Sequence, residues 1–258
     1  MALPLKCGCL QTFVMMKAIK RINAWSSPRN VSTAFMYAFA QRQDTVVVDE
    51  PLYAHYLSKT DSEAAHPGRD QILASQSRDG QRVVREVLFG PYHRPVVLFK
   101  QMAHHLIHLD ESFLSDMDNI LLIRDPRAII ASYSQVISNP VMADVGIEKL
   151  YGLFHQLREQ GRLAAVIDAK ELLLNPASVL NQLCHCLGLP FDERMLHWLP
   201  GPRPEDGVWA PYWYATVHRS TGFQPYQPRH YELPENLKTL AEQCRPYYEE
   251  LYEASLKA

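Results

Sequence analysis

The stretch from Ile19 to Phe39 reads IKRINAWSSPRNVSTAFMYAF and decides the fold of the chain around it. Residues 19–25 form an apolar run typical of a strand, and residues 26–30 form a turn rich in Ser, Pro and Asn. The apolar side chains that follow recur at i, i+3, i+4, i+7 and i+8, at Val31, Ala34, Phe35, Ala38 and Phe39. The stretch therefore predicts a strand, a turn and a helix in direct succession.

A turn of this kind can hold an anion. The first N–H groups of a helix have no partner within it, and the helix dipole is positive at that end. Ser32 and Thr33 add hydroxyl donors, and Arg29 adds a permanent cation whose forked donors suit phosphate. The alternative interpretation is an ordinary capped helix with an arginine on the surface.

The turn differs from the phosphate loop of ATP-hydrolysing enzymes, G-x-x-x-x-G-K-[ST]. Ser32 and Thr33 are preceded by Val31, so neither the glycine nor the lysine of that motif is in place. The run Val46–Glu50 resembles the acidic strand that binds metal in such enzymes, but without the lysine it has little weight. ATP hydrolysis is disfavoured, and a P-loop nucleotide kinase or hydrolase remains an alternative function.

Further apolar runs alternate with helical patterns along the chain. We expect strands at 45–48, 96–99, 119–123 and 163–167, and helices at 81–89, 101–109, 126 to about 137, and 176–187. The polar residues 58–80 are interpreted as a mobile connection. Such alternation predicts an α/β fold of three P-loop-like layers, with a central parallel sheet of about five strands and helices on both faces.

The expected domain covers residues 18–258, with an N-terminal arm at 1–17 that has no clear cleavage site. The segment from about 201 onward is rich in Pro and aromatic residues, and we expect it to cap the sheet as a lid. In open parallel sheets, ligands bind outside the carboxyl ends of the strands. The candidate site residues on this argument are Ser27 to Thr33, Asp49, Glu50, Lys100 and Arg124.

Composition narrows the function further. The 258 residues carry 26 Lys and Arg against 28 Asp and Glu, a formal charge of −2, which argues against a nucleic-acid partner. No apolar run approaches the ~20 residues that span a bilayer, so we expect a cytoplasmic protein without a membrane partner. The five cysteines are interpreted as reduced thiols, and no metal site is expected. His104 and His108, at i and i+4, lack the glutamate of the H-E-x-x-H motif.

Two segments resemble the nucleotide-binding motifs of sulfotransferases. Residues Ser27–Thr33 are similar to the 5'-phosphosulfate loop of that family, although Val31 stands where the family commonly has glycine. Arg124-Asp125-Pro126 followed by Ser132 is similar to its 3'-phosphate motif. Residues 218–222, HRSTG, resemble a late loop that closes over the nucleotide. The resemblance extends from about Ala18 to Phe223.

This resemblance implies 3'-phosphoadenosine 5'-phosphosulfate as donor co-substrate and sulfuryl transfer to a hydroxyl or amine of a small molecule, without a metal. It assigns the 5'-phosphate to Arg29 and the loop residues around it, and the 3'-phosphate to Arg124 and Ser132. The implied donor-binding set is Ser27, Arg29, Asn30, Val31, Ser32, Thr33, Arg124, Ser132, Arg219, Ser220, Thr221 and Gly222. Val31 leaves a third reading open, a non-catalytic nucleotide-binding domain.

Sulfuryl transfer needs a base that takes the proton of the acceptor. Glu50, His104 and His105 are the candidates, and the sequence does not choose among them. Lys100 is expected either to contact the bridging oxygen of the donor or to pair with Asp49. The aromatic residues near the expected lid either line the acceptor pocket, stack on adenine or pack internally; they are Trp209, Tyr212, Trp213, Tyr214 and Tyr226.

Overall fold

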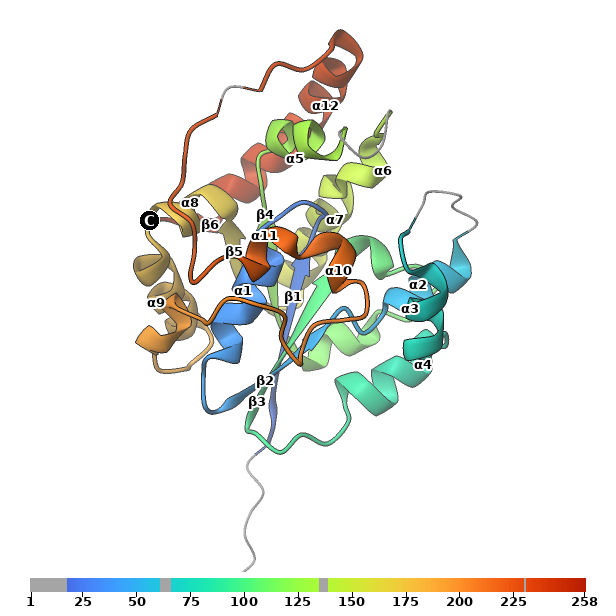
Figure 1. Ribbon diagram of the computed structural model, residues 1–258, viewed down its shortest axis with the longest axis vertical. Helices are drawn as coiled ribbons and strands as arrows, with labels where there is room; N and C mark the ends of the chain where they lie inside the picture. Colours follow the sequence, from blue (N-terminus) through green and yellow to red (C-terminus); the bar gives the residue numbers. More distant parts are fainter. Residues whose placement is uncertain (1–17, 61–65, 135–138, 230) are drawn as a thin grey trace, which may run out of the picture.

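The computed structural model describes residues 18–60, 66–134, 139–229 and 231–258. Its core is one parallel sheet in the order β2-β3-β1-β4-β5-β6. The strands are β1 (Lys20–Ser26), β2 (Thr45–Asp49), β3 (Val96–Met102), β4 (Asp118–Ile123), β5 (Leu163–Asp168) and β6 (Ser255–Leu256). The five strands expected from the sequence are confirmed, and β6 adds a sixth at the edge. Figure 1 shows β1, β2 and β3 in the centre, with helices around them.

The strands bury both of their faces, as parallel strands do. Ile22 and Ala24 of β1 pack on one side with α1 (Ser32–Ala40) and α9 (Pro176–Cys186). Trp25 packs on the other side with α5 (Pro126–Tyr133), α7 (Ile147–Glu159) and α12 (Glu235–Glu253). The predicted three-layer α/β architecture is therefore confirmed.

The structure corrects the prediction of a helix at 101–109. β3 continues to Met102 because its partner β1 is equally long, and Trp25 and Ser26 pair with Gln101 and Met102. A single 3-10 turn, η2 (Ala103–His105), follows. The first residues of the expected helix therefore belong to a strand end and a turn.

The segment at 58–80, expected to be a mobile connection, is also different. It contains the end of α2 (Tyr53–Lys59), all of α3 (Arg69–Ser75) and the start of α4 (Gly80–Val83), and residues 61–65 lie outside the described chain. The helix expected at 81–89 is α4 followed by a π-helical turn, η1 (Val84–Leu88). Asp79 begins α4 by accepting hydrogen bonds from the N–H groups of Gln81 and Arg82.

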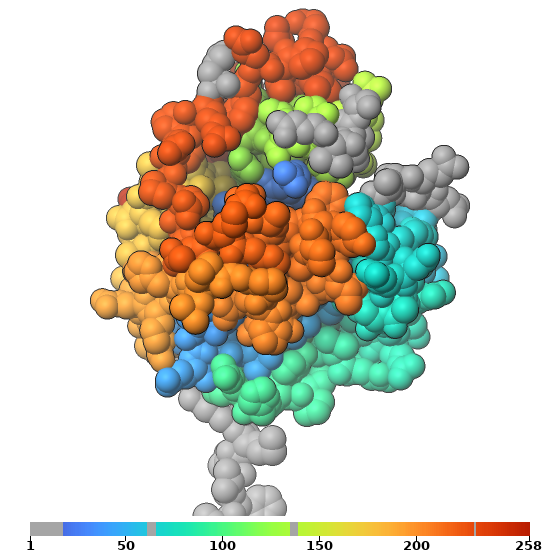
Figure 2. Space-filling model, viewed as in Figure 1, coloured from blue at the N-terminus to red at the C-terminus, as the bar shows by residue number. Residues whose placement is uncertain are grey.

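The C-terminal part divides into two regions with different positions. The short helices α10 (Ala210–Trp213) and α11 (Ala215–His218) belong to the orange segment that covers the middle of the face shown in Figure 2. Helix α12 instead packs on the sheet beside α5 and α7. The prediction that everything after 201 caps the crevice is therefore wrong for α12, whose apolar face belongs to the core.

Four short elements complete the chain: η3 (Ser112–Asp116), α6 (Met142–Val145), α8 (Ala169–Leu174) and η4 (Glu193–Leu196). Helix α5 ends at Tyr133, and the end expected near residue 137 lies outside the described residues, as does the arm at 1–17. Within the described part of the chain, no helix combines the length and hydrophobicity needed to cross a membrane.

Candidate functional site

Two adjoining cavities open at the carboxyl ends of the central strands. The Glu50 cavity, of about 160 Å³, is lined by Glu50, Lys100, His104, His105 and aromatic side chains. The Arg124 cavity, of about 300 Å³, is lined by Arg124, Ser132, Ser220 and Gly222 among others. The two cavities share five lining residues: Arg29, Asn30, Thr33, Trp213 and Tyr214. The loop after β1 therefore forms the boundary between them.

The basic side chains of the two predicted phosphate motifs converge at this boundary. Nη1 of Arg124 donates to the backbone oxygen of Arg29 at 2.5 Å, and Nε of Arg29 donates to Oγ of Ser132 at 2.9 Å. Arg29 has a φ of 62°, a left-handed backbone that is uncommon for any residue other than glycine. The segments that follow β1 and β4 are thus joined to each other and to α5 by direct hydrogen bonds.

The N-terminus of α1 presents its first N–H groups to both cavities. The helical hydrogen bonds begin at Phe35, whose N–H donates to the backbone oxygen of Val31 at 2.9 Å. Asn30 takes up the N–H of Val31 through Oδ1 at 2.7 Å, so this donor is already used. Within the described residues, the N–H groups of Ser32 and Thr33 have no protein acceptor.

Val31 does not distort the loop. Its φ is −84° and its ψ is 14°, which any L-residue adopts without strain. Glycine would be required here only for a positive φ or a close backbone approach. In this chain the positive φ falls on Arg29 instead.

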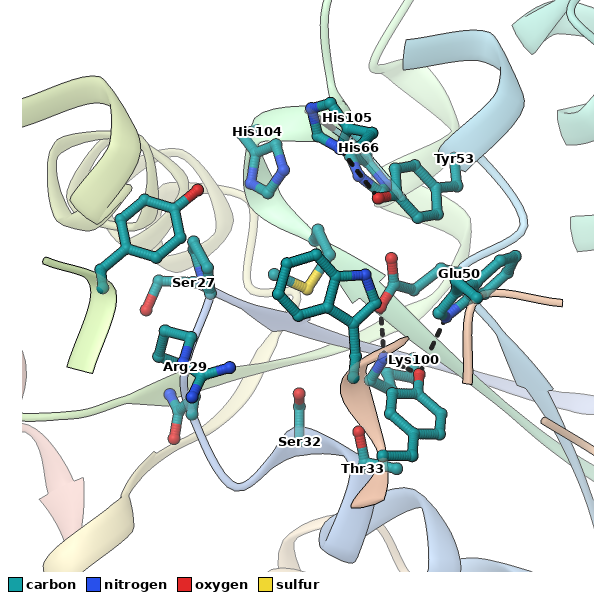
Figure 3. Close-up of a pocket in the computed structure, with 17 residues that line it drawn as sticks. Ser27, Arg29, Ser32, Thr33, Glu50, Tyr53, His66, Lys100, His104 and His105 are labelled. Carbon is teal, nitrogen blue, oxygen red and sulfur yellow. Dashed lines mark hydrogen bonds and ion pairs between the residues drawn. The ribbon is translucent and has the colours of Figure 1, made fainter. Parts of the chain in front are cut away.

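In the Glu50 cavity, Lys100 is the centre of a buried polar network (Figure 3). Its Nζ donates to Oδ1 of Asp49 at 2.9 Å, to the hydroxyl of Tyr214 at 2.9 Å, and to Oε1 of Glu50. The three N–H bonds of the ammonium are all used. The sequence left open whether Lys100 pairs with Asp49 or faces the donor, and the structure has it paired with both carboxylates.

Glu50 has properties suited to accepting a proton. Burial raises the pKa of its carboxyl; the ammonium of Lys100 opposes this rise and the charge of Asp49 adds to it, and the net shift is upward from 4.5. Burial alone lowers the pKa of Lys100, but Asp49 and Glu50 outweigh it and hold that pKa well above 10.5. Glu50 has a φ of 39°, so its backbone is strained at the site.

The histidines beside Glu50 are neutral near pH 7. Burial lowers the pKa of His104 to about 4, and burial with the nearby histidines and Lys100 lowers the pKa of His105 well below 6.5. The ring of His105 is stacked between Tyr53 and Tyr56, with centroid distances of 4.8 Å to each. Tyr53, His66, His104 and His105 line the cavity and form an uncharged aromatic wall in the upper part of Figure 3.

Comparison with known proteins identifies the family. A profile of the sulfotransferase domain matches residues 20–252, which is most of the chain. The chain belongs to the sulfotransferase family. The family expected from the two phosphate motifs is thereby confirmed.

Two proteins of Arabidopsis thaliana are similar over 228 residues, or 88% of this chain. They are branched-chain-amino-acid aminotransferase-like protein 2, at 39% identity, and branched-chain-amino-acid aminotransferase-like protein 1, at 40%. The chain spans about 40% of the length of these relatives. Their names describe proteins that are longer than this chain, whereas the family match describes residues 20–252 of this chain.

Among solved structures, a sulfotransferase domain from the curacin biosynthetic pathway is similar in fold. It covers 92% of this chain and 98% of its own, with a TM-score of 0.51 and 17% sequence identity. At this identity the likeness concerns the arrangement of the elements. It agrees with the sheet order and the helical layers described above.

The structure does not bring every predicted donor-binding residue to the cavities. Ser220 and Gly222 line the Arg124 cavity, but Arg219 and Thr221 are exposed and line neither cavity. The hydroxyl of Ser220 donates to the oxygen of Val217 at 2.7 Å and accepts the indole N–H of Trp198 at 3.1 Å. Because this hydroxyl is already bonded, the turn shapes the cavity but offers it few free polar groups.

Several residues of the Glu50 cavity are not apparent from the sequence. Tyr53, His66 and Tyr133 line it, and His66 Nδ1 lies 2.9 Å from the hydroxyl of Tyr53. His66 lies within residues 58–80, which the sequence suggested were a connection, so its place in a cavity could not be foreseen. His104 and His108, whose spacing in the sequence resembles that of a metal-binding pair, line different pockets.

Proposed function

We propose that this domain transfers the sulfuryl group of 3'-phosphoadenosine 5'-phosphosulfate to a hydroxyl or amine of a small molecule. The observation that carries the proposal is the position of Arg29, which lines both cavities. One cavity also contains Arg124, and the other contains the buried carboxylate of Glu50. Donor and acceptor would approach from opposite sides of one loop. That arrangement suits direct transfer between them.

The Arg124 cavity has the chemistry for a doubly phosphorylated nucleotide. Arg124 and Ser132 would hold the 3'-phosphate, since guanidinium donors pair well with phosphate oxygens. Arg29 and the N–H groups of Ser32 and Thr33 would hold the 5'-phosphate, where charge accumulates as the sulfate bond breaks. Arg29 would then exchange its hydrogen bond to Ser132 for one to the ligand.

In the reaction, the acceptor oxygen or nitrogen attacks sulfur in line with the bridging oxygen of the donor. The bond between sulfur and the bridging oxygen breaks, and adenosine 3',5'-bisphosphate leaves with the electron pair. By analogy with phosphoryl transfer, positioning and charge stabilisation supply most of the catalysis. The proton of the acceptor passes to a base in the Glu50 cavity.

Glu50 is the base that the geometry favours. Its Oε1 is bonded to Lys100, while Oε2 has no recorded hydrogen bond within the described residues. A carboxylate with a raised pKa accepts protons more readily than an ordinary one, whereas imidazoles with strongly lowered pKa values are weak bases. His104 and His105 would shape the wall of the acceptor pocket.

The charges of the Glu50 cavity bear on the acceptor. Asp49 and Glu50 carry two negative charges against the single positive charge of Lys100, and the adjacent histidines are neutral. Arg29 would be occupied by the donor, whose sulfuryl oxygens are also negative. An acceptor that carries a carboxylate would be repelled, so we expect an uncharged or cationic one with apolar surface for the aromatic wall.

The alternatives have little support from the site. The loop holds no lysine of the ATPase type, and the valine that favoured a non-catalytic domain adopts an ordinary backbone. Thermal unfolding with adenosine 3',5'-bisphosphate, ATP and ATP with Mg²⁺ tests the donor class. We expect the bisphosphate alone to raise the melting temperature clearly. Stabilisation by ATP with Mg²⁺ but not by the bisphosphate would contradict the proposal.

Binding must then lead to transfer. Incubation with radiolabelled donor and a panel of neutral alcohols, phenols and amines should give a labelled acceptor in amounts equal to the bisphosphate released. Tight binding of the bisphosphate without transfer to any acceptor would favour a nucleotide-binding domain without activity.

A further inference from the structure

Asp49 is buried and makes hydrogen bonds in two directions. Its Oδ1 accepts from Nζ of Lys100 at 2.9 Å, across the β2–β3 pair. Its Oδ2 accepts from the hydroxyl of Tyr214 at 2.7 Å and from the N–H of Gly207 at 3.1 Å. The side chain is 1% exposed and does not line the Glu50 cavity. It is therefore bonded to the strand ends on one side and to the C-terminal segment on the other.

Tyr214 completes the connection. Its hydroxyl donates to Asp49 and accepts from both Lys100 and the indole N–H of Trp209, at 2.9 and 3.0 Å. Tyr214 and Trp209 both line the Glu50 cavity, and Tyr214 also lines the Arg124 cavity. The segment 207–214 thus forms one wall of the site and is fastened to the strand ends through Asp49 on β2 and Lys100 on β3.

Asp49 and Glu50 are adjacent in sequence but differ in what they can do. Asp49 uses both oxygens in hydrogen bonds from Lys100, Tyr214 and Gly207, so a proton added to it would displace one of them. Glu50 keeps one oxygen available in the cavity. The two acids share the same ammonium, so each influences the charge of the other.

We infer that Asp49 is a positioning residue, which holds the wall formed by residues 207–214 against the strand ends and whose charge tunes Glu50 as the base. The inference rests on the proposed function in its second half, because it takes Glu50 to be the proton acceptor. The first half, the fastening of the wall, does not depend on catalysis.

The expected direction of the charge effect follows from the groups around Glu50. They are Asp49 on β2, Lys100 on β3, Tyr53 on α2 and Tyr214 in the C-terminal segment. Of these, the negative charge of Asp49 raises the pKa of Glu50 and the positive charge of Lys100 lowers it. Removing the charge of Asp49 lowers that pKa. Activity that needs ionised Glu50 then persists to lower pH.

The first test is the pH dependence of kcat/KM for sulfuryl transfer in the wild type and in Asp49→Asn. We expect the wild-type rate to fall on the acid side with a midpoint above 4.5, and the midpoint of the variant to lie roughly one pH unit lower. The affinity for adenosine 3',5'-bisphosphate should change less than about twofold, because Asp49 does not line the Arg124 cavity. A variant with lower activity but the same midpoint would overturn the tuning role.

Asp206→Asn is the matched control. Asp206 fastens the same C-terminal region, since it accepts from the hydroxyl of Tyr37 at 2.6 Å and lies 2.9 Å from Nε2 of His218. Within the described residues, Asp206 forms no hydrogen bond or ion pair with Lys100 or Glu50. We expect this variant to leave the midpoint unchanged. An equal shift in both variants would mean that loosening the segment, and not the charge of Asp49, moves the midpoint.

The second test measures the wall without any reaction. Hydrogen exchange of the backbone N–H groups in residues 207–214 should be faster in Asp49→Asn and in Tyr214→Phe than in the wild type. Unchanged exchange in both would overturn the fastening role. Tyr214→Phe retains the charge of Asp49, so it keeps this test available if Asp49→Asn does not fold. Failure of the wild type to bind bisphosphate or to transfer sulfate would instead count against the proposed function.

Discussion

The two cavities on either side of Arg29 are built from opposite electrostatic components. The Arg124 cavity contains guanidinium groups, a hydroxyl and the N-terminus of α1, all of which attract anions. At the Glu50 cavity the ammonium of Lys100 is paired with two carboxylates, Glu50 in the lining and Asp49 behind it, and aromatic rings and neutral histidines form the wall away from Arg29. One side is suited to binding a charged nucleotide, and the other to a reaction partner that carries no negative charge.

The difference indicates how each side would contribute to transfer. In the proposed reaction, the binding energy for the donor would come from charge pairs on one side of the loop. On the other side, the burial of Glu50 and Lys100 strengthens the interactions of the base. A change on one side should therefore affect binding or chemistry selectively, and the variants below are ranked by the size of the effect we expect.

The largest expected effect comes from Glu50→Gln, which keeps the shape of the side chain and removes the base. The rate of transfer, kcat, should fall by about 10²- to 10⁴-fold, the usual contribution of a general base. The affinity for adenosine 3',5'-bisphosphate, measured by calorimetry, should stay within about twofold of the wild type. Normal kcat in Glu50→Gln, together with a large loss in His105→Ala, would move the base to the histidine.

Arg124→Ala should act on the opposite side. The loss of a charged hydrogen-bonding partner of the 3'-phosphate should weaken bisphosphate binding by about 100-fold, or about 2.7 kcal/mol. Binding is measured by calorimetry, and Arg124→Lys, which retains the charge, serves as control with an intermediate loss. Wild-type affinity in Arg124→Ala would remove the 3'-phosphate from this residue.

Acceptors that differ only in charge test the electrostatic character of the Glu50 cavity, and the expected changes in rate are smaller. Tyrosol, tyramine and 4-hydroxyphenylacetate present the same phenol with a neutral, a positive and a negative tail. We expect kcat/KM for the carboxylate to be about tenfold lower than for the neutral compound, because of repulsion by the acidic pair. Preference for the carboxylate would contradict the negative character assigned to this cavity.

Much of this arrangement could be predicted from the sequence, and the parts that could not be predicted have a physical reason. The strands were predictable because buried parallel strands are short apolar runs, and the two phosphate motifs marked the ends of β1 and β4. The two-residue β6 is too short for any periodicity, and the extension of β3 to Met102 depends on its pairing with β1. Such elements are determined by their neighbours in space.

The sequence predicted part of the lining of each cavity and missed the rest, along with the contacts between distant residues. Arg29, Arg124 and Ser132 belong to motifs with fixed spacing. The connection of Asp49 to Tyr214 joins residues 165 positions apart, and no local pattern announces it. His66 lies in a polar segment whose spacing carries no signal of burial. Long-range contacts of these kinds appear only in the folded structure.

The smallest expected effect concerns stability and the aromatic wall. The pKa of His105 is lowered well below 6.5 by burial, so the folded state disfavours its protonation. Below pH 6.5 the unfolded state binds this proton and the folded state does not, so the free energy of unfolding falls as the pH drops toward the lowered pKa. The fall is at most about 1.4 kcal/mol per pH unit, and above pH 6.5 this loss is absent. His105→Phe, which keeps a ring between Tyr53 and Tyr56, should therefore lose less stability between pH 7 and pH 5.

Chemical denaturation at several pH values measures this slope. The control is His185→Phe, since that side chain is exposed on α9 and far in the chain from the cavity. A slope in His105→Phe that equals the wild-type slope would mean that His105 is not held neutral by its surroundings.

Arg29 belongs to both cavities, and its substitution tests the central claim most directly. The measurement is the rate of sulfuryl transfer by Arg29→Ala at saturating donor, beside the wild type. If Arg29 stabilises charge at the point where the cavities meet, kcat should fall by about 10²- to 10³-fold, in addition to any loss of donor affinity. A wild-type kcat at saturating donor would contradict the claim that transfer takes place across this residue.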